Sequence, residues 1–209
     1  PALDAGFDSG EWSGCRTLNV DVFRPEGSGH RPETRFRLQY DREGLYGLFS
    51  VRDRFVRCVA RKFQDPVCRD SCVEFFVRPA HGRGYVNFEF SAAGVLLAQH
   101  VADCRRRPGT DDVRPLTERE AAGIRIYHSL PGRIEQELAQ ETCYELGFFL
   151  PFSIFAGTHG APAPVSRTIW SGNVYKCGDD TSHPHWASWR PVRRVNFHEP
   201  DCFGDLEFE

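Results

Sequence analysis

The chain has 209 residues, 40% of them hydrophobic, so it can bury a sizeable core and is not a disordered chain. Its 26 basic and 29 acidic residues give a net charge of −3, and this near-balance argues against a nucleic-acid partner. No apolar run approaches the roughly 18 residues of a membrane span, which argues against a membrane partner. Residues 1–5 show no basic region followed by an apolar one, so no signal peptide is expected there. The oligomeric state stays open.

Alternation of apolar and polar residues predicts strands along most of the chain. In the first half these strands are expected over residues 34–40, 45–51, 56–60, 72–78, 84–91 and 95–98. The strands at 72–78 and 84–91 form the clearest hairpin, joined by the turn at 79–83. Six of their apolar side chains share the face expected to be buried: Val73, Phe75, Val77, Val86, Phe88 and Phe90. Glu74, Asn87 and Glu89 fall on the opposite face.

The second half repeats this pattern after a polar loop predicted over residues 103–116. Thr117 and Glu120 have the spacing of a capping box, which predicts one short helical turn. Further strands are expected over 124–128, 142–150, 169–176 and 203–208, with a short helix or turn over 151–155. No linker and no repeat interrupts the pattern. Nine or ten strands with few helices predict one all-β domain over 1–209, an antiparallel β-sandwich or barrel.

The eight cysteines are too sparse for a disulfide scaffold, and no zinc-site spacing is present. We therefore expect reduced and mostly buried thiols, as in a cytoplasmic protein, with Cys58, Cys72 and Cys143 filling small apolar positions in strands. A hard metal ion would need clustered oxygens, which the pairs Asp111–Asp112 and Asp179–Asp180 could supply. Such adjacent aspartates are far more often solvated loop charges, so the metal site is left unassigned.

Aromatic and polar residues concentrate between residues 170 and 189. Asn173 and Tyr175 point the same way on the expected strand, which runs into a loop with two Trp and two His in 183–189. Trp186 and Trp189 could stack on the apolar face of a sugar ring, while planar polar groups bind its hydroxyls. The alternative is that both indoles cap the end of the core.

A second candidate polar surface lies on the hairpin, where Asp70 and Glu74 precede Asn87 and Glu89 in the sequence. Carboxylates and an amide on one sheet face could line a pocket, although the outer face of a hairpin is often polar without any function.

Five segments, in this order, resemble the carbohydrate-binding family 9-like domains. They are residues 70–77, 85–90, 172–179, 188–191 and 197–204, and the resemblance spans about 36 to 208. It implies a jelly-roll-like β-sandwich that binds sugar without catalysis. In this family a sugar terminus is held between two Trp side chains, with polar side chains around it and structural calcium nearby.

The resemblance also implies which residues form the site. Asn173 and either Trp186 or Trp189 match the strand end and Trp-bearing loop of the family, and Asp70 and Glu74 match its carboxylate-bearing strand. The full expected set is Trp186, Trp189, Asn173, Tyr175, Lys176, Glu74, Asp70, Asn87 and His198. Lys176 has the wrong parity for this face if the strand stays regular. Trp12, the only Trp in the first half, lies before the matched region, and calcium is expected only by resemblance.

Two other functions remain open from the sequence. Glu74 and Glu89 could act as the acid/base pair of a sugar-active enzyme, which requires two carboxyl groups flanking a cleft. The chain could also be a haem-binding, DOMON-like module of the related sandwich superfamily. Because the chain has no Met, Met/His ligation of haem is impossible, and only His/His ligation is left.

Overall fold

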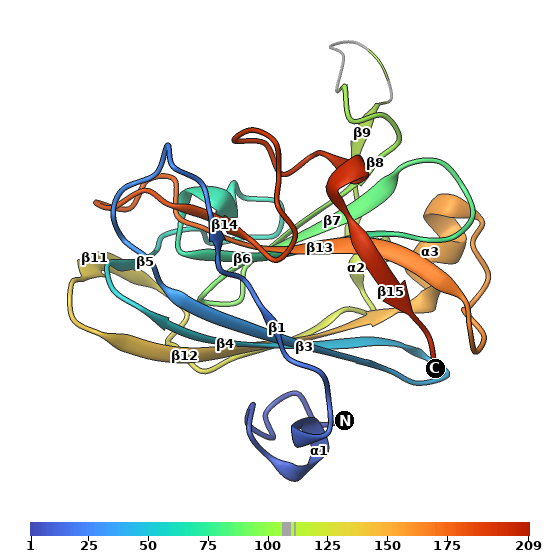
Figure 1. Ribbon diagram of the computed structural model, residues 1–209, viewed down its shortest axis with the longest axis horizontal. Helices are drawn as coiled ribbons and strands as arrows, with labels where there is room; N and C mark the ends of the chain where they lie inside the picture. Colours follow the sequence, from blue (N-terminus) through green and yellow to red (C-terminus); the bar gives the residue numbers. More distant parts are fainter. Residues whose placement is uncertain (106–109, 111) are drawn as a thin grey trace.

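The computed structural model of the chain describes residues 1–105, 110 and 112–209. Two antiparallel sheets pack face to face as a β-sandwich (Figure 1). Sheet 1 has the order β1-β3-β4-β12-β10, namely β1 (Leu18–Asn19), β3 (Glu33–Tyr40), β4 (Gly44–Asp53), β12 (Thr142–Pro151) and β10 (Arg125–His128).

Sheet 2 carries the candidate site. Its order is β2-β14-β13-β6-β7-β8-β9, and β15 also pairs with β13. The strands are β2 (Val22–Phe23), β14 (Trp186–Ser188), β13 (Ile169–Cys177), β6 (Cys72–Arg78), β7 (Tyr85–Ser91), β8 (Leu96–Val101), β9 (Val113–Pro115) and β15 (Gly204–Glu207). A small third sheet pairs β11 (Ile134–Leu138) with β5 (Val56–Cys58). The predicted all-β sandwich is therefore confirmed.

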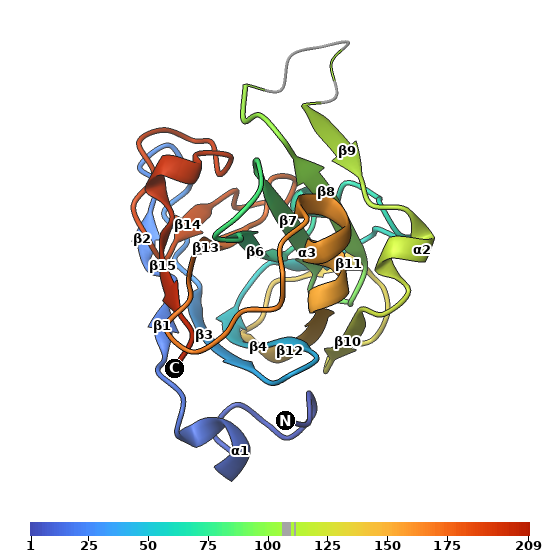
Figure 2. The ribbon, with the colours of Figure 1, turned by 90° about the vertical axis from the view of Figure 1, so that its right-hand side faces the viewer.

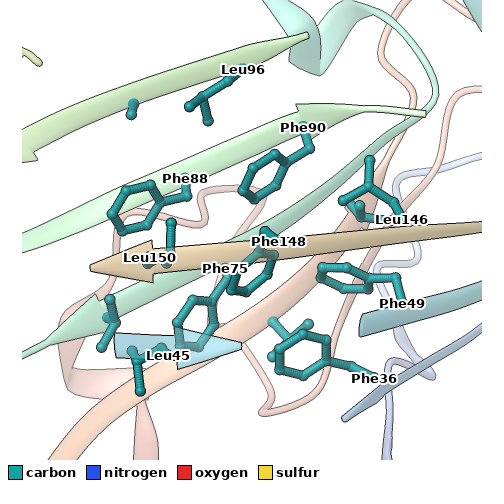
Figure 3. Close-up of a cluster of buried hydrophobic side chains, with 14 of the residues drawn as sticks. Phe36, Leu45, Phe49, Phe75, Phe88, Phe90, Leu96, Leu146, Phe148 and Leu150 are labelled. Carbon is teal, nitrogen blue, oxygen red and sulfur yellow. The ribbon is translucent and has the colours of Figure 1, made fainter. Parts of the chain in front are cut away.

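The core lies between the two sheets and is rich in aromatic rings (Figure 3). Phe148 of sheet 1 stacks on Phe90 of sheet 2 with ring centroids 5.1 Å apart, and it also stacks on Phe75. All six side chains predicted to be buried on the β6–β7 hairpin belong to this cluster. The hairpin pairs Phe75 with Phe88 and Glu74 with Glu89, so the predicted register is confirmed.

Helices are short and occupy the margins of the sandwich. They are α1 (Gly10–Ser13), α2 (Glu118–Ala121) and α3 (Phe152–His159), with 3-10 turns η1 (Val67–Arg69) and η2 (Pro200–Cys202). Both halves of the predicted capping box form at α2, between Thr117 and Glu120. The capping box satisfies two backbone N–H groups at the start of this helix.

Some predicted features differ in the structure. Cys143 is exposed rather than buried, because it alternates with Tyr144 on β12 and only the Tyr144 face meets the core. All eight cysteines lie in the described residues and are free thiols; Cys58, Cys72 and Cys177 are buried. β11 and the short β1, β2 and β14 were not predicted; β1, β2 and β14 have only two or three residues each, too few to show an alternating pattern by themselves. The predicted loop at 103–116 includes β9, and part of it lies outside the described residues.

Each sheet also has an outer face that the chain covers. The α1 segment lies under sheet 1 (Figures 1 and 2). Its Trp12 packs against Tyr46, Leu48 and Phe149. Over sheet 2, the segment between β14 and β15, coloured red, crosses the face that points away from the core (Figure 1). Phe197 and Phe203 of this segment pack on Tyr85 and Tyr175. We call the two sides of sheet 2 its inner face, toward sheet 1, and its outer face.

Candidate functional site

The outer face of sheet 2 contains a pocket of about 370 Å³, within the range of small-molecule sites. Strands β6, β7, β8 and β13 form its floor, and η1, β14 and the segment over 195–198 form its rim. Its lining combines carboxylates, rings, amides and thiols: Glu74, Glu89, Asp179, Trp186, Phe197, Phe76, Gln99, Asn196, Cys68 and Cys177. Apolar surface therefore lies beside groups that can accept and donate hydrogen bonds. We call this site the outer-face pocket.

Two aromatic side chains of the rim are held in place by other residues. The indole N–H of Trp186 donates a hydrogen bond to Oδ1 of Asp179 at 2.8 Å, and the ring is half-buried. Phe197 stacks on Tyr175 with ring centroids 4.1 Å apart, and the Tyr175 hydroxyl donates to the Phe197 carbonyl at 3.0 Å. Tyr175 thus supports the pocket from beneath Phe197. Both rim rings are oriented before any ligand arrives.

Glu74 and Glu89 are directly opposite each other across β6 and β7, on the floor of the pocket. Burial, followed by the neighbouring Glu89 charge, raises the pKa of Glu74 well above its usual range. Asn87 donates to Oε1 of Glu89 at 2.7 Å, so it orients a lining carboxyl group without lining the pocket itself. Burial also raises the pKa of Asp179. A buried carboxyl group in this state can hydrogen-bond a neutral hydroxyl of a ligand without a counter-ion.

His198 lines the pocket at the rim. Its Nδ1 lies 2.6 Å from the Tyr85 hydroxyl, and its ring packs against Phe76 with centroids 5.1 Å apart. Together with Trp186 and Glu74, it makes three of the nine expected site residues that line the outer-face pocket. Tyr175 and Asn87 lie on the same sheet face and support it.

Asp70, Asn173 and Trp189 have structural contacts away from the pocket lining. Asp70 is buried and accepts hydrogen bonds from the backbone N–H groups of Val59 and Ala60, both at 2.8 Å. Asn173 holds the chain after β14, because its amide bonds both the N–H and the carbonyl of Arg190. Trp189 packs against the core cluster.

Lys176 lies on the inner face of β13, as its parity indicated, and is fully buried. Its Nζ lies 2.9 Å from Oδ2 of Asp53 and donates to Nε2 of His185 at 2.8 Å. Although burial opposes ionisation, the charge of Lys176 holds the pKa of Asp53 well below its usual range. Burial, followed by the charge of Lys176, lowers the pKa of His185 to about 3. The structure thus places Lys176 in a closed ion-pair cluster that also contains His30, where no sugar can reach it.

Several pocket residues were not among the expected set. Glu89 shares the outward parity of Glu74, so alternation carried a signal for it, but a polar outer face is also common without function. Phe197, Gln99 and Asp179 reach the pocket from a covering segment, from β8 and from the end of β13. Only the tertiary fold brings these three residues together.

The expected calcium site finds no support from clustered side chains. Among the described residues, the one group of three or more closely spaced His, Cys, Asp or Glu side chains is Cys72, Glu74 and Cys177. Two thiols are unsuited to calcium, which takes six to eight oxygen ligands. Asp179 accepts a hydrogen bond from the Trp186 indole, and Oδ2 of Asp180 lies 4.0 Å from Nε of Arg69. Asp111 lies outside the described residues. Calcium therefore stays a prediction.

A β-sandwich with an aromatic and carboxyl-lined pocket on its outer sheet face has the groups that a carbohydrate-binding module needs. The model of carbohydrate-binding family 9 matches residues 13–208, and the chain belongs to this family. The resemblance inferred from the sequence is confirmed. The comparisons give no support to the enzyme and haem alternatives. No functionally curated protein matches the sequence. Among the described residues, no helix is long and apolar enough to cross a membrane.

Three solved structures share the fold. A Bacteroides uniformis protein, described as a candidate carbohydrate-binding protein, is 31% identical, with a TM-score of 0.84 over 95% of this chain and 88% of its own. A family 9 module of Caldicellulosiruptor kristjanssonii in complex with glucose is 13% identical, with a TM-score of 0.67 over 100% of this chain and 91% of its own. The cellotriose complex of a module from that organism is 12% identical, with a TM-score of 0.65 and coverages of 99% and 88%.

Proposed function

We propose that the outer-face pocket binds one hexose ring at the end of a glucose-containing oligosaccharide, without catalysis. The observation that carries this proposal is the pairing of a held indole, Trp186, with the carboxyl groups of Glu74 and Asp179 in one pocket. A sugar ring needs both: its C–H face stacks on an aromatic plane, and its hydroxyls need fixed polar partners. The glucose and cellotriose held by the Caldicellulosiruptor modules support this choice of sugar.

Trp186 supplies the stacking plane, and Phe197 offers a second apolar surface on the rim. Glu74, Glu89 and Gln99 lie on strands of the floor and are placed to bind hydroxyl groups. Because Tyr175 and Asp179 already hold Phe197 and Trp186, few side chains must be ordered on binding, which favours affinity.

The proposal that the pocket does not cleave sugar follows from the position of its carboxyl groups. Glycosidases use two carboxyl groups on opposite sides of the scissile bond. Glu74 and Glu89 are instead neighbours on adjacent strands, on the floor of the pocket. This arrangement suits ligand binding better than bond cleavage.

Isothermal titration calorimetry with glucose, cellobiose and cellotriose tests the function. We expect saturable binding, and we expect Trp186→Ala to weaken it by about 5- to 150-fold, equivalent to about 1–3 kcal/mol. The protein should stay folded because the ring is half-buried at the rim. An assay for reducing ends should detect no cleavage of cellotriose. Absence of binding to all three sugars, or a Trp186→Ala variant that binds like the wild type, would refute the site.

A further inference from the structure

The floor of the outer-face pocket brings two thiols and a carboxyl group together. Cys72 of β6 and Cys177 of β13 are directly paired across the two strands, and Glu74 lies two residues along on the same face. Sγ of Cys177 lies 3.2 Å from Oε1 of Glu74, and Sγ of Cys72 lies 3.9 Å from it. All three ligand atoms lie within 4.8 Å of one another. Regular strand pairing fixes this arrangement.

These distances match three corners of a tetrahedral zinc site. Zn–S bonds of about 2.3 Å and Zn–O bonds of about 2.1 Å place neighbouring S and O ligands about 3.6 Å apart. The two observed S···O distances bracket this value, so small side-chain rotations suffice. Thiolate ligands favour zinc and other soft ions over calcium or magnesium.

The present partners of the three groups are weak. In the portion of the chain that the structure describes, Glu74 accepts its hydrogen bonds from the thiols of Cys177 and Cys72. A thiol is a poor donor, so a buried carboxyl group gains little from it. A metal ion at this position would give all three groups a stronger partner.

The pocket leaves room for a fourth ligand. Glu74 and Cys177 line the cavity, and so does Cys68 of η1. A tetrahedral ion bound by three side chains at this floor would therefore direct its fourth position into the cavity, toward water or toward Cys68.

We propose that Cys72, Glu74 and Cys177 form a binding site for one zinc ion at the floor of the outer-face pocket. Binding forms two Zn–S bonds and one Zn–O bond, and the protons of the two thiols and of the buried Glu74 carboxyl group are released to solvent. No oxidation or reduction takes place. The proposal does not depend on carbohydrate binding, because zinc uptake is measured in the absence of any sugar.

The experiment uses the full chain, reduced and freed of metal with a chelator that is then removed. Titration with Zn²⁺ should give one ion per chain with a dissociation constant of about 1 µM or tighter. Titration with Co²⁺ should give the near-ultraviolet charge-transfer absorption of cobalt–thiolate bonds. This spectrum needs no variant, so it tests the proposal even where a substitution impairs folding.

Variants then locate the ion. Cys72→Ala and Cys177→Ala should each weaken Zn²⁺ binding by about 100-fold or more and reduce the cobalt–thiolate absorption. Cys143→Ala is the matched control, because Cys143 is exposed on sheet 1, and it should bind like the wild type. Cys68→Ala reports whether Cys68 is the fourth ligand or water is.

Three results would overturn the site. The first is wild-type protein that takes up no Zn²⁺, and the second is a Co²⁺ complex without thiolate absorption. The third is binding that survives both Cys72→Ala and Cys177→Ala, or that Cys143→Ala weakens equally. If the protein takes up zinc but binds none of the tested sugars, the proposed function is refuted and the zinc site is not.

Discussion

Two neighbouring strands of sheet 2 carry one buried ionisable side chain each: Lys176 of β13 on the inner face and Glu74 of β6 on the outer face. The two side chains are stabilised differently. On the inner face, Lys176 contacts Asp53, His185 and the Cys177 carbonyl, each within 3.1 Å. On the outer face, Glu74 is bonded by two thiols and faces Glu89. The inner cluster is buried away from the pocket, whereas the outer carboxyl group opens onto a cavity. Burial of an ionisable residue therefore does not by itself mark a binding site, whereas contact with a cavity is a sign of one.

The largest expected effect comes from breaking the inner cluster. Lys176→Met keeps an apolar stem but leaves the Asp53 carboxylate buried without its cation, so unfolding free energy should fall by about 3–5 kcal/mol. Urea denaturation measures this loss. Lys62→Met, at the exposed other lysine of the chain, is the control and should change stability by less than about 0.5 kcal/mol. A loss below about 1 kcal/mol for Lys176→Met would mean that the cluster contributes little to the fold.

Acid should weaken the same cluster. Burial and the charge of Lys176 lower the pKa of His185 to about 3. Between about pH 6.5 and pH 3, the His185 imidazole is therefore neutral in the folded protein but protonated in the unfolded chain. His185 should therefore contribute a fall in unfolding free energy of about 1.4 kcal/mol per pH unit as the pH drops from about 6 to 4.5. The lowered pKa of Asp53 acts only below about pH 4.

Denaturation curves at several pH values, in wild type and in His185→Gln, check this slope. The variant should show a slope smaller by about 1.4 kcal/mol per pH unit. Burial also lowers the pKa of His159, to about 4, so His159→Gln serves as the second comparison. Equal slopes in wild type and His185→Gln would show that His185 does not titrate in this way.

Trp186 of β14 and Trp189, which directly follows this strand, offer a third comparison. Trp189 packs on the core cluster, and the Arg190 guanidinium lies 4.5 Å from its ring centroid. Trp189→Ala should therefore lower unfolding free energy by about 2 kcal/mol, less than for a fully buried Trp, and leave sugar affinity unchanged. Trp186→Ala should show the reverse pattern. If Trp189→Ala weakened sugar binding while Trp186→Ala did not, the stacking role would belong to Trp189.

The sequence predicted the parts of the fold that depend on period-2 alternation. The β6–β7 hairpin, its buried face and its outward Glu74 follow from alternation alone, because a one-residue slip would move every side chain to the other face. Parity likewise indicated that Lys176 faces inward, although the density of polar residues nearby suggested a sugar contact. Where pattern and local composition disagreed, the pattern was right.

The rest of the site could not be predicted, because it depends on which distant segments cover the outer face. Phe197 reaches the pocket only because the chain after β14 crosses sheet 2 and stacks on Tyr175. Asn173 is polar like a ligand-binding residue, yet it lies in the middle of β13 rather than at its end, and its amide is used by Arg190. A polar residue's free hydrogen-bonding capacity is set by tertiary neighbours, which no local pattern contains.

The smallest expected effect on stability is that of Glu74→Gln, and it completes the comparison between the two faces. Burial favours the neutral form of the Glu74 carboxyl group, and glutamine has the same size and is also neutral, so unfolding free energy should change by less than about 1 kcal/mol. Sugar affinity should fall by about 10-fold, because an amide presents its donors and its acceptor to a ligand hydroxyl differently from a carboxyl group. Calorimetry and urea denaturation on the same preparation measure both quantities.

Asp70→Asn is the control, because the Asp70 carboxylate accepts hydrogen bonds from two backbone N–H groups. This variant should lose about 1–3 kcal/mol of stability without a direct effect on sugar binding. If Glu74→Gln destabilised the protein as much as Lys176→Met, the outer carboxyl group would be a structural element like the inner cluster. This result would argue against the outer face as the binding face.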